Sequence, residues 1–330
     1  KTCLKKQGET IVAFLNRQKI LQLPFIQISS IVCFGNIFVT PALLGACAKA
    51  GISITYLTSY GRFLARVQGG TQGNVLLRKE QYRISDDKFR SALIAKNIVV
   101  GKIFNARVTL GRALRDHAEK VDIQRLERAV QTLDILMTRA KNEKDLDVLR
   151  GLEGNASKEY FGVLDELIVT QKSDFFCKER NKRPPKDRFN ALLSFLYTLL
   201  YHDMRAALEG GGLDPSVGFL HRDRPGRFSL ALDLMEEFRS VVADRVALSL
   251  INLKQVTGKD FRILENGAVM MNEKARKEVL IFYQKRKQES IWHPFLEEQM
   301  HIGLLFHVQA LLLARYLRGD IDGYPPFLWR

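Results

Sequence analysis

The sequence lacks an apolar run long enough to cross a membrane. A transmembrane helix needs about 20 consecutive apolar residues, and the longest apolar stretches here, near Ala191 and Leu304, are shorter and carry polar or charged side chains. The opening residues, KTCLKKQGET, also lack the apolar core of a signal peptide. We therefore expect neither membrane insertion nor secretion.

Cysteine is scarce and scattered. The four cysteines, Cys3, Cys33, Cys47 and Cys177, form no C-x-x-C pair and have no zinc-ligand spacing. Disulfide frameworks belong to oxidising compartments. The pattern therefore favours reduced thiols in a cytoplasmic protein.

Acidic residues are too few to balance the basic ones. The chain has 51 Lys and Arg against 36 Asp and Glu, a net charge of +15, and Glu9 is the only acidic residue among the first seventy. A basic surface of this size attracts a polyanion. Nucleic acid is thus the leading partner on charge alone, and a basic protein that is merely soluble is the alternative.

The first seventy residues have the pattern of a small β domain. Short β-branched or aromatic runs, TIVAFL, ISSIVCFG, ISITYLT and RFLARVQ, alternate with Gly, Asn and Ser. One helix is expected at TPALLGACAKAG, where Thr40 can cap, Pro41 suits the first turn and Gly51 ends the run. We predict a β domain over residues 1–70.

The remainder of the chain has helical periodicity. A glycine-containing stretch near 69–76 leads into it, so we place a linker and the start of the first long helix at 71–84 and a helical domain at 85–330. The predicted class is α+β, a small N-terminal β-sheet domain followed by a larger all-α C-terminal domain. Helices are expected near 76–98, 100–141, 144–171, 187–209, 227–256, 272–288 and 294–318.

One stretch, GFLHRDRPGRFSLALDLMEEF, places a histidine ahead of three carboxylates. Asp233, Glu236 and Glu237 stand at helical spacing, which predicts neighbouring positions on one side of a helix. His221 follows a Gly- and Pro-containing loop that can fold back over the helix start. An imidazole near carboxylates suits Mn²⁺ or Mg²⁺. The alternative is a structural helix whose carboxylates face solvent or pair with Arg239.

A third ligand and a set of cations complete this hypothesis. Glu153 is the best further candidate because Gly154 and Ala156 leave room around it, although by itself it reads as a surface glutamate. Phosphodiester chemistry needs a metal ion on the phosphate and cations that neutralise its developing charge. The candidates for the second role are Arg222, Arg224, Arg227 and Arg239.

Four motifs carry a resemblance to a known family. GLEGNASKEYF, RNKRPPKDRFNALLSFLYTLLYHDM, GFLHRDRPGRFSLALDLMEEFR and GNVLLRKEQYR closely resemble the CRISPR-associated integrase family, the first-numbered Cas protein, and most specifically its type I-C branch. The resemblance covers nearly the whole chain. It also implies that the family's extreme N-terminal strand is missing from the β domain here.

The resemblance implies a metal-dependent DNA endonuclease and integrase that inserts new spacers into a CRISPR array. The family's metal ligands match Glu153, His221 and Glu236, with Mn²⁺ or Mg²⁺ as the cofactor. Asp233 matches a further acidic residue of the catalytic site, and whether it is a direct ligand stays open. Glu237 is then a structural or surface residue. The implied chemistry is attack of a DNA 3′-hydroxyl on a phosphodiester at a repeat boundary.

The resemblance also implies DNA contacts. Tyr160 and Tyr197 would lie near the site and orient the strand or stack on a base; buried packing between helices is the equal alternative.

Further backbone contacts are expected in two basic segments. LLRKEQYR lies at the start of the helical domain, where a solvated helix face is the alternative, and ERNKRPPKDR forms a loop before a helix. The residues concerned are Arg78, Lys79 and Arg83 in the first segment and Arg183 and Lys186 in the second.

Family members form homodimers through the β domain, and two such dimers flank a dimer of the small second-numbered Cas protein. We therefore expect a homodimer, this small partner in a heterohexamer, and DNA as pre-spacer and repeat. Two other functions stay open. One is a non-catalytic nucleic-acid-binding helical protein with a structural polar network, and the other is a repair nuclease that cuts branched DNA with the same metal site.

Overall fold

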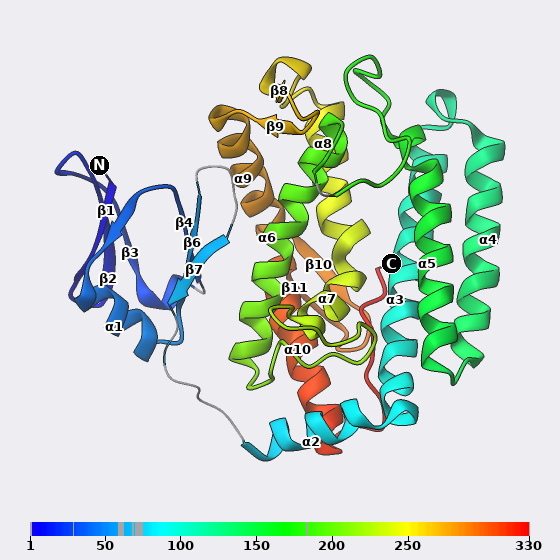
Figure 1. Cartoon of the computed structure of the whole chain (residues 1–330), viewed down its shortest axis with the longest axis horizontal. Helices are drawn as coiled ribbons and strands as arrows, with labels where there is room; N and C mark the ends of the chain where they lie inside the picture. Colours follow the sequence, from blue (N-terminus) through cyan, green and yellow to red (C-terminus); the bar gives the residue numbers. More distant parts are fainter. Residues whose placement is uncertain are drawn as a thin grey trace. The chain divides into compact units, whose positions relative to one another are not determined.

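The computed structural model describes residues 2–28, 30–58, 63–67, 69, 75–182 and 184–329. The chain divides into two compact units, Lys1–Gly73 and Asn74–Arg330. The first is built mainly of strands and the second mainly of helices (Figure 1), so the predicted fold class is confirmed in outline. The first helix of the second unit begins at Val75 and packs within that unit, inside the range 71–84 where a linker and the start of the first long helix were predicted.

The N-terminal unit contains two small sheets. One has the strand order β3-β2-β1-β5, in which β1 and β5 run parallel, and the other has the order β4-β6-β7. The four predicted runs correspond to β2, β4, β6 and β7, whereas β1, β3 and β5 were missed because they are short or rich in polar residues. The strands are β1 Thr2–Gln7, β2 Thr10–Leu15, β3 Gln18–Pro24, β4 Ser30–Phe34, β5 Ile37–Val39, β6 Ser53–Leu57 and β7 Phe63–Val67.

Helix α1, Pro41–Lys49, closes the core of this unit. Pro41 stands at its first position, and Gly51 follows its end with φ 71°, a left-handed conformation that favours glycine. Burial raises the pKa of the Cys33 thiol to about 11, so this cysteine acts as a packing residue. All four cysteines are free. The core consists of Ile11, Cys33, Val39, Leu43, Cys47, Ile52 and Ile54.

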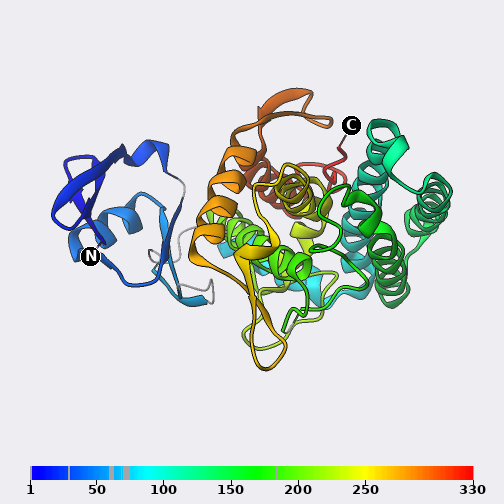
Figure 2. The same ribbon diagram turned by 90° about the horizontal axis from the view of Figure 1, so that it is seen from above.

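The second unit is organised around the long helix α3. Helices α3, α4 and α5 pack against one another, and Figure 2 shows them nearly end on. The predicted helix 76–98 is in fact two helices, because the Asp87 side chain accepts hydrogen bonds from the backbone N–H groups of Phe89 and Arg90 and caps a new start. The helices are α2 Val75–Asp86, α3 Lys88–Asp116, α4 Ile123–Asn142, α5 Leu146–Val163, α6 Arg188–Gly210, α7 Ser229–Met235, α8 Arg245–Asn252, α9 Glu273–Gln288 and α10 Ile302–Arg318.

Two hairpins correct the prediction of an all-α domain. Strands β8, Phe261–Ile263, and β9, Val269–Met271, pair antiparallel, as do β10, Ser290–His293, and β11, Glu298–His301. Each strand has only three or four residues, too few to show an alternating pattern. The last helix therefore starts at Ile302 and not near 294.

The predicted helix 227–256 is irregular in its middle. Helix α7 ends at Met235, a 3₁₀ turn η4 spans Glu236–Phe238, a π-helical segment η5 spans Arg239–Asp244, and α8 follows. The 3₁₀ and π segments advance by a different angle per residue from an α-helix, and π segments are frequent at functional sites. The irregular winding changes which side chains of this segment share a face.

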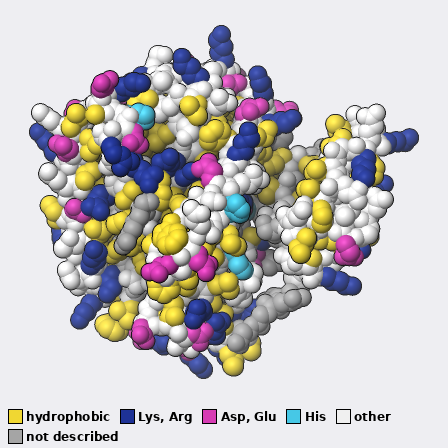
Figure 3. Space-filling model, turned by 180° about the vertical axis from the view of Figure 1, so that it is seen from behind, with side chains coloured by type: hydrophobic (Ala, Val, Ile, Leu, Met, Phe, Trp, Pro, Cys, Tyr) yellow, Lys and Arg dark blue, Asp and Glu magenta, His cyan; other side chains and the backbone are white. Residues whose placement is uncertain are grey.

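Among the residues that the structure describes, no helix has both the length and the apolar character needed to cross a membrane. Figure 3 shows Lys and Arg side chains spread across one face of the protein, as the net charge of +15 predicts.

Candidate active site

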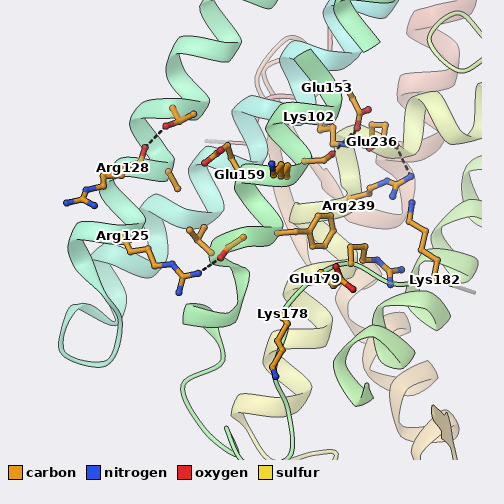
Figure 4. A pocket seen from close by; sticks show the side chains of 18 of the residues that line it. Lys102, Arg125, Arg128, Glu153, Glu159, Lys178, Glu179, Lys182, Glu236 and Arg239 are labelled. Atoms are coloured by element: carbon orange, nitrogen blue, oxygen red, sulfur yellow. Dashed lines mark hydrogen bonds and ion pairs between the residues drawn. The ribbon is translucent and has the colours of Figure 1, made fainter. Parts of the chain in front are cut away.

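The three predicted ligands Glu153, His221 and Glu236 line one groove of the helical unit, of about 820 Å³. They come from α5, from the loop before α7, and from η4. Lys102 of α3 and Arg239 of η5 line the same groove, and Figure 4 shows both close to the two glutamates. Packing of α3 against α5 and η4 thus brings together residues that are far apart in the sequence.

Lys102 links the two glutamates. Its ammonium makes an ion pair with Glu153 Oε1 and stands 2.7 Å from Glu236 Oε2, while Arg239 Nη2 is 2.7 Å from Glu236 Oε1. Glu236 is only 2% exposed. Burial alone would raise the pKa of this carboxyl, but the opposing charges of Arg239 and Lys102 lower the pKa to about 2. Glu236 is therefore ionised at neutral pH.

Glu153 is the more accessible of the two carboxylates. Its side chain is 23% exposed, and Oε1 also accepts a hydrogen bond of 2.9 Å from the Ser157 hydroxyl one turn later on α5. Helix α5 starts at Leu146 because the Asp145 carboxylate caps the N–H groups of residues 147 and 148.

Asp233 holds His221 in place. Its Oδ1 lies 2.6 Å from His221 Nδ1, and its two oxygens accept hydrogen bonds of 2.7 to 2.9 Å from the backbone N–H groups of Phe219, Leu220 and His221. The side chain is fully buried. Because both oxygens are already engaged, this geometry fits a residue that orients His221 better than a direct metal ligand, and the assignment of Asp233 as a catalytic residue stays a prediction.

The loop before His221 folds back over the start of α7, as its glycines and proline predict. The N–H of Leu230 donates to the carbonyl of Pro215 at 2.9 Å. Gly218 is required for the close approach, since a Cβ at this position would lie 2.8 Å from Asp233 Oδ2. Arg150 supports the same loop by donating from Nε to the carbonyl of Leu220 at 2.6 Å.

Glu237 turns away from this groove toward the C-terminal segment, residues 319–329, which follows α10. It accepts hydrogen bonds from the Tyr324 hydroxyl at 2.7 Å, the Phe327 backbone N–H at 2.8 Å and the Gln309 amide at 3.0 Å. Burial raises the pKa of this carboxyl to about 8. The expectation that the three carboxylates share one side of a helix is therefore wrong, because η4 is not α-helical, and Glu237 is a structural residue.

The structure does not support base stacking on Tyr160 and Tyr197. The two residues are 5% and 8% exposed, and their hydroxyls donate to Asp244 at 3.0 and 2.7 Å. Burial raises the pKa of both phenols well above the ordinary range and that of Asp244 to about 6. The guanidinium of Arg239 lies 4.8 Å from the Tyr197 ring centroid. Both rings pack between helices beneath the site, which was the alternative.

A second groove of about 560 Å³ meets the first. Glu153 and His221 line both grooves, so the candidate site lies where the two join. The second groove is strongly basic, although Arg222 is also paired with Asp147 at 3.1 Å. Its cations are Arg150, Arg222, Arg224 and Arg227, three of which were predicted from the sequence.

Other predicted DNA contacts lie elsewhere. Arg78, Lys79 and Arg83 are on α2 and line neither groove. Lys186, in the loop before α6, also lines neither groove. Arg183 lies outside the residues that the structure describes.

Sequence reasoning missed several cations of the first groove. Arg125 and Arg128 stand one turn apart on α4, a helical spacing that could have revealed them, and Figure 4 shows them at a distance from Glu153 and Glu236. Arg180 and Lys182 belong to the basic loop ERNKRPPKDR, in which other residues were predicted, and Lys178 directly precedes it. Lys102 had one sequence indication, since it interrupts the apolar stretch NIVVGKIF.

The residue types fit a divalent cation. Two carboxylates and an imidazole form the donor set that Mn²⁺ or Mg²⁺ accepts, and the buried Glu236 Oε2 has no hydrogen-bond partner beyond its ion pair with Lys102. Within the described ranges, no three His, Cys, Asp or Glu side chains are already grouped as a metal site. The assignment of Glu153, His221 and Glu236 as ligands stays a prediction.

Comparison with known proteins places the chain in a family. Residues 1–285 match the family model of the CRISPR associated protein Cas1. The chain is 53% identical over 327 residues, 99% of its length and 95% of the relative's, to a protein of Chlorobaculum tepidum named CRISPR-associated endonuclease Cas1 1.

Two solved structures share the fold. A casposase bound to integration product has a TM-score of 0.82 at 21% identity, covering 100% of this chain and 92% of the casposase chain. A Cas6-RT-Cas1–Cas2 complex has a TM-score of 0.79 at 24% identity, covering 99% of this chain and 35% of the other. The family match and the identity to the Chlorobaculum protein show that this chain belongs to the CRISPR-associated protein Cas1 family.

Proposed function

We propose that this protein is a metal-dependent DNA endonuclease and integrase that inserts new spacers into a CRISPR array. One observation carries the proposal: an oriented histidine and two carboxylates meet where two basic grooves join. A groove lined by Lys and Arg attracts a phosphate backbone, and the groups at the junction suit a divalent ion.

The enzyme class rests on the relatives. The prediction of an endonuclease is confirmed by the Chlorobaculum protein, which carries that name and matches 99% of this chain. Integration is supported by the fold shared with a casposase bound to its integration product. The motifs GLEGNASKEYF and GFLHRDRPGRFSLALDLMEEFR support the finer proposal of the type I-C branch. The four free cysteines support the proposal that the protein acts in the cytoplasm.

The side chains of the site have separable roles. Glu153, His221 and Glu236 would hold Mn²⁺ or Mg²⁺, which when bound polarises the phosphate and stabilises the departing oxygen. Asp233 engages Nδ1 of His221, so the Nε2 lone pair stays available as a ligand. Arg239 keeps Glu236 ionised through their 2.7 Å ion pair.

The proposed reaction is a direct transesterification. The 3′-hydroxyl of a DNA fragment loses its proton and attacks a phosphodiester at the repeat boundary. A new P–O bond forms, the old bond to the 3′-oxygen breaks, and that oxygen takes up a proton. The number of phosphodiester bonds is unchanged, so the step needs no external energy source and no covalent enzyme intermediate.

Partner proteins form part of the same proposal. In the β3-β2-β1-β5 sheet, Leu15, Ile20, Leu21 and Phe38 are exposed by 45 to 62%, which suits a homodimer contact. A fold shared with a chain of a Cas1–Cas2 complex supports the small second-numbered Cas protein as the second partner. We propose two homodimers flanking one dimer of this protein, with pre-spacer and repeat DNA as ligands.

The test is an insertion assay with a 3′-hydroxyl pre-spacer, a plasmid carrying the repeat, Mn²⁺ or Mg²⁺, and the small partner protein. Native protein should join the strands, and Glu153→Ala, His221→Ala and Glu236→Ala should each reduce joining to background while circular dichroism stays native. Glu159→Ala, a matched carboxylate on α5 in the same groove, should retain activity.

Two outcomes contradict the proposal. Full activity in all three variants would contradict the assignment of Glu153, His221 and Glu236 to the active site. Efficient cutting of branched DNA without insertion under any metal or partner condition would make the protein a repair nuclease.

A further inference from the structure

Lys102 lies between two of the side chains that would hold the proposed ion, Glu153 and Glu236. Its ammonium contacts Glu153 Oε1 and stands 2.7 Å from Glu236 Oε2, and its side chain is 14% exposed. We propose that Lys102 is an internal counter-cation, which holds the site in the metal-free protein and is displaced by the ion to bind a DNA phosphate. This inference rests on the proposed function.

A cation is needed here when no ion is present. Glu236 is 2% exposed, and Arg239 neutralises it at Oε1 only. A second carboxylate brought close to a buried one is costly without a positive partner, because the local dielectric constant is low. Lys102 supplies that charge from α3, where its neighbour Ile103 is buried and anchors the helix backbone.

The ammonium and the ion compete for the same oxygens. Glu153 Oε1 and Glu236 Oε2 are both engaged by Lys102, so a divalent ion binds them only after the ammonium leaves. The apparent affinity of a ligand is reduced by the fraction of protein in which its site is available. Lys102 therefore weakens metal binding, and it neutralises the charge of the carboxylates when no ion is bound.

Displacement gives Lys102 a second position. Lysine has a flexible four-carbon stem and a compact charge, so it can leave the carboxylates while α3 stays fixed. It lines the groove of about 820 Å³ together with the cations of α4 and of the loop before α6. Once released, its ammonium is available to a phosphate in that groove. Metal binding thus raises the affinity of the groove for DNA in two ways, because the ion adds positive charge and the released lysine can contact a phosphate.

The first experiment measures metal affinity and activity separately. Lys102→Met keeps most of the side-chain volume and removes the charge, so Mn²⁺ affinity measured by isothermal titration calorimetry should rise roughly tenfold or more. Strand cutting at saturating Mn²⁺ should fall by a similar factor, because the phosphate contact is lost. If Lys102 only stabilised the fold, Lys102→Met would lower both the Mn²⁺ affinity and the rate of strand cutting. Lys158→Met, in the same groove, should leave the Mn²⁺ affinity unchanged.

The second experiment uses the native protein and so does not depend on the folding of a variant. Amine labelling followed by mass spectrometry should show Lys102 protected without metal and several-fold more reactive with Mn²⁺, with Lys158 as the internal reference. Unchanged Lys102 labelling, or a Lys102→Met protein that binds Mn²⁺ no more tightly, would overturn the inference. Failure of the native protein to bind Mn²⁺ at all would instead contradict the proposed function.

Discussion

At the scale of single residues, the contacts of each carboxylate oxygen decide its role. Asp233, Glu236 and Glu237 lie within five positions of one another. Asp233 accepts hydrogen bonds from three backbone N–H groups and orients His221. Glu236 pairs with Lys102 and Arg239. Glu237 accepts hydrogen bonds from the C-terminal segment. Of these three carboxylates, only Glu236 therefore contacts Lys102 and so fits the proposed exchange of the ammonium for a metal ion.

A substitution at Asp233 tests its positioning role. Asp233→Asn keeps the size but presents an NH₂ group to N–H donors, so we expect a loss of about 1–3 kcal/mol in the free energy of unfolding. Strand cutting should fall about 10- to 100-fold, because groups that hydrogen-bond to a metal-ligating histidine have effects of this size.

A double variant separates the two effects. In a His221→Ala background, Asp233→Asn should add little to the activity loss while its stability cost persists in urea denaturation. Undiminished activity in the single variant would show that His221 needs no such support.

At the scale of elements, the irregular segment 229–252 determines the site. The 3₁₀ turn η4 separates Glu236 from Glu237, and the C-terminal segment holds η4 through Tyr324 and Phe327. Gly101 of α3 allows this packing, since a Cβ there would lie 2.9 Å from Pro326 Cβ and 3.2 Å from Glu237 Cγ. The C-terminal segment thus positions Glu236 from the side opposite the groove.

The buried Glu237 predicts a pH dependence of stability. Its pKa is about 8 in the folded protein against an ordinary 4.5, so the folded state keeps a proton that the unfolded state releases. The free energy of unfolding should therefore fall as pH rises between these two values. Asp244, with a pKa of about 6 against 3.8, acts with the same sign but only up to about pH 6.

The measurement is urea denaturation at several pH values between 6 and 8. Glu237→Gln, which is neutral throughout, should show a flatter dependence than the native protein. Equal slopes in the two proteins would mean that Glu237 is ionised in the folded state.

At the scale of the whole molecule, charge and groove geometry act together. The net charge of +15 favours a polyanion as partner, and the two basic grooves that meet at Glu153 and His221 are where we propose that it binds. The sequence also predicted backbone contacts from Arg78, Lys79 and Arg83 on α2, which line neither groove. The cations nearest the candidate ligands are Lys102 of α3 and Arg239 of η5, which pair with Glu236.

The salt dependence of DNA binding tests which cations contact the backbone. The logarithm of the binding constant should fall with the logarithm of salt concentration by about 0.9 per neutralised phosphate. Lys178→Ala and Lys182→Ala, both in the first groove, should each reduce that slope by about 1 if each lysine contacts one phosphate.

The same measurement on Lys79→Ala and Arg83→Ala decides the prediction for α2. Fluorescence anisotropy over a salt series gives all the slopes. If neither Lys178→Ala nor Lys182→Ala changes the slope, DNA does not bind through the first groove.

The sequence by itself determined the order of the two units, most helices and the candidate ligands. Helical period, capping residues such as Asp87 and turn glycines such as Gly51 act between near neighbours, so they are visible in the sequence. Glu153, His221 and Glu236 were recognised through long motifs that resemble a family.

Only the tertiary structure decided the partners of these residues. The ion pairs of Lys102, the burial of Tyr160 and Tyr197 and the turning of Glu237 toward the C-terminal segment all join residues distant in the sequence. Local patterns carry no information about such contacts, because ion-pair strength, burial and pKa depend on what the packed helices bring together.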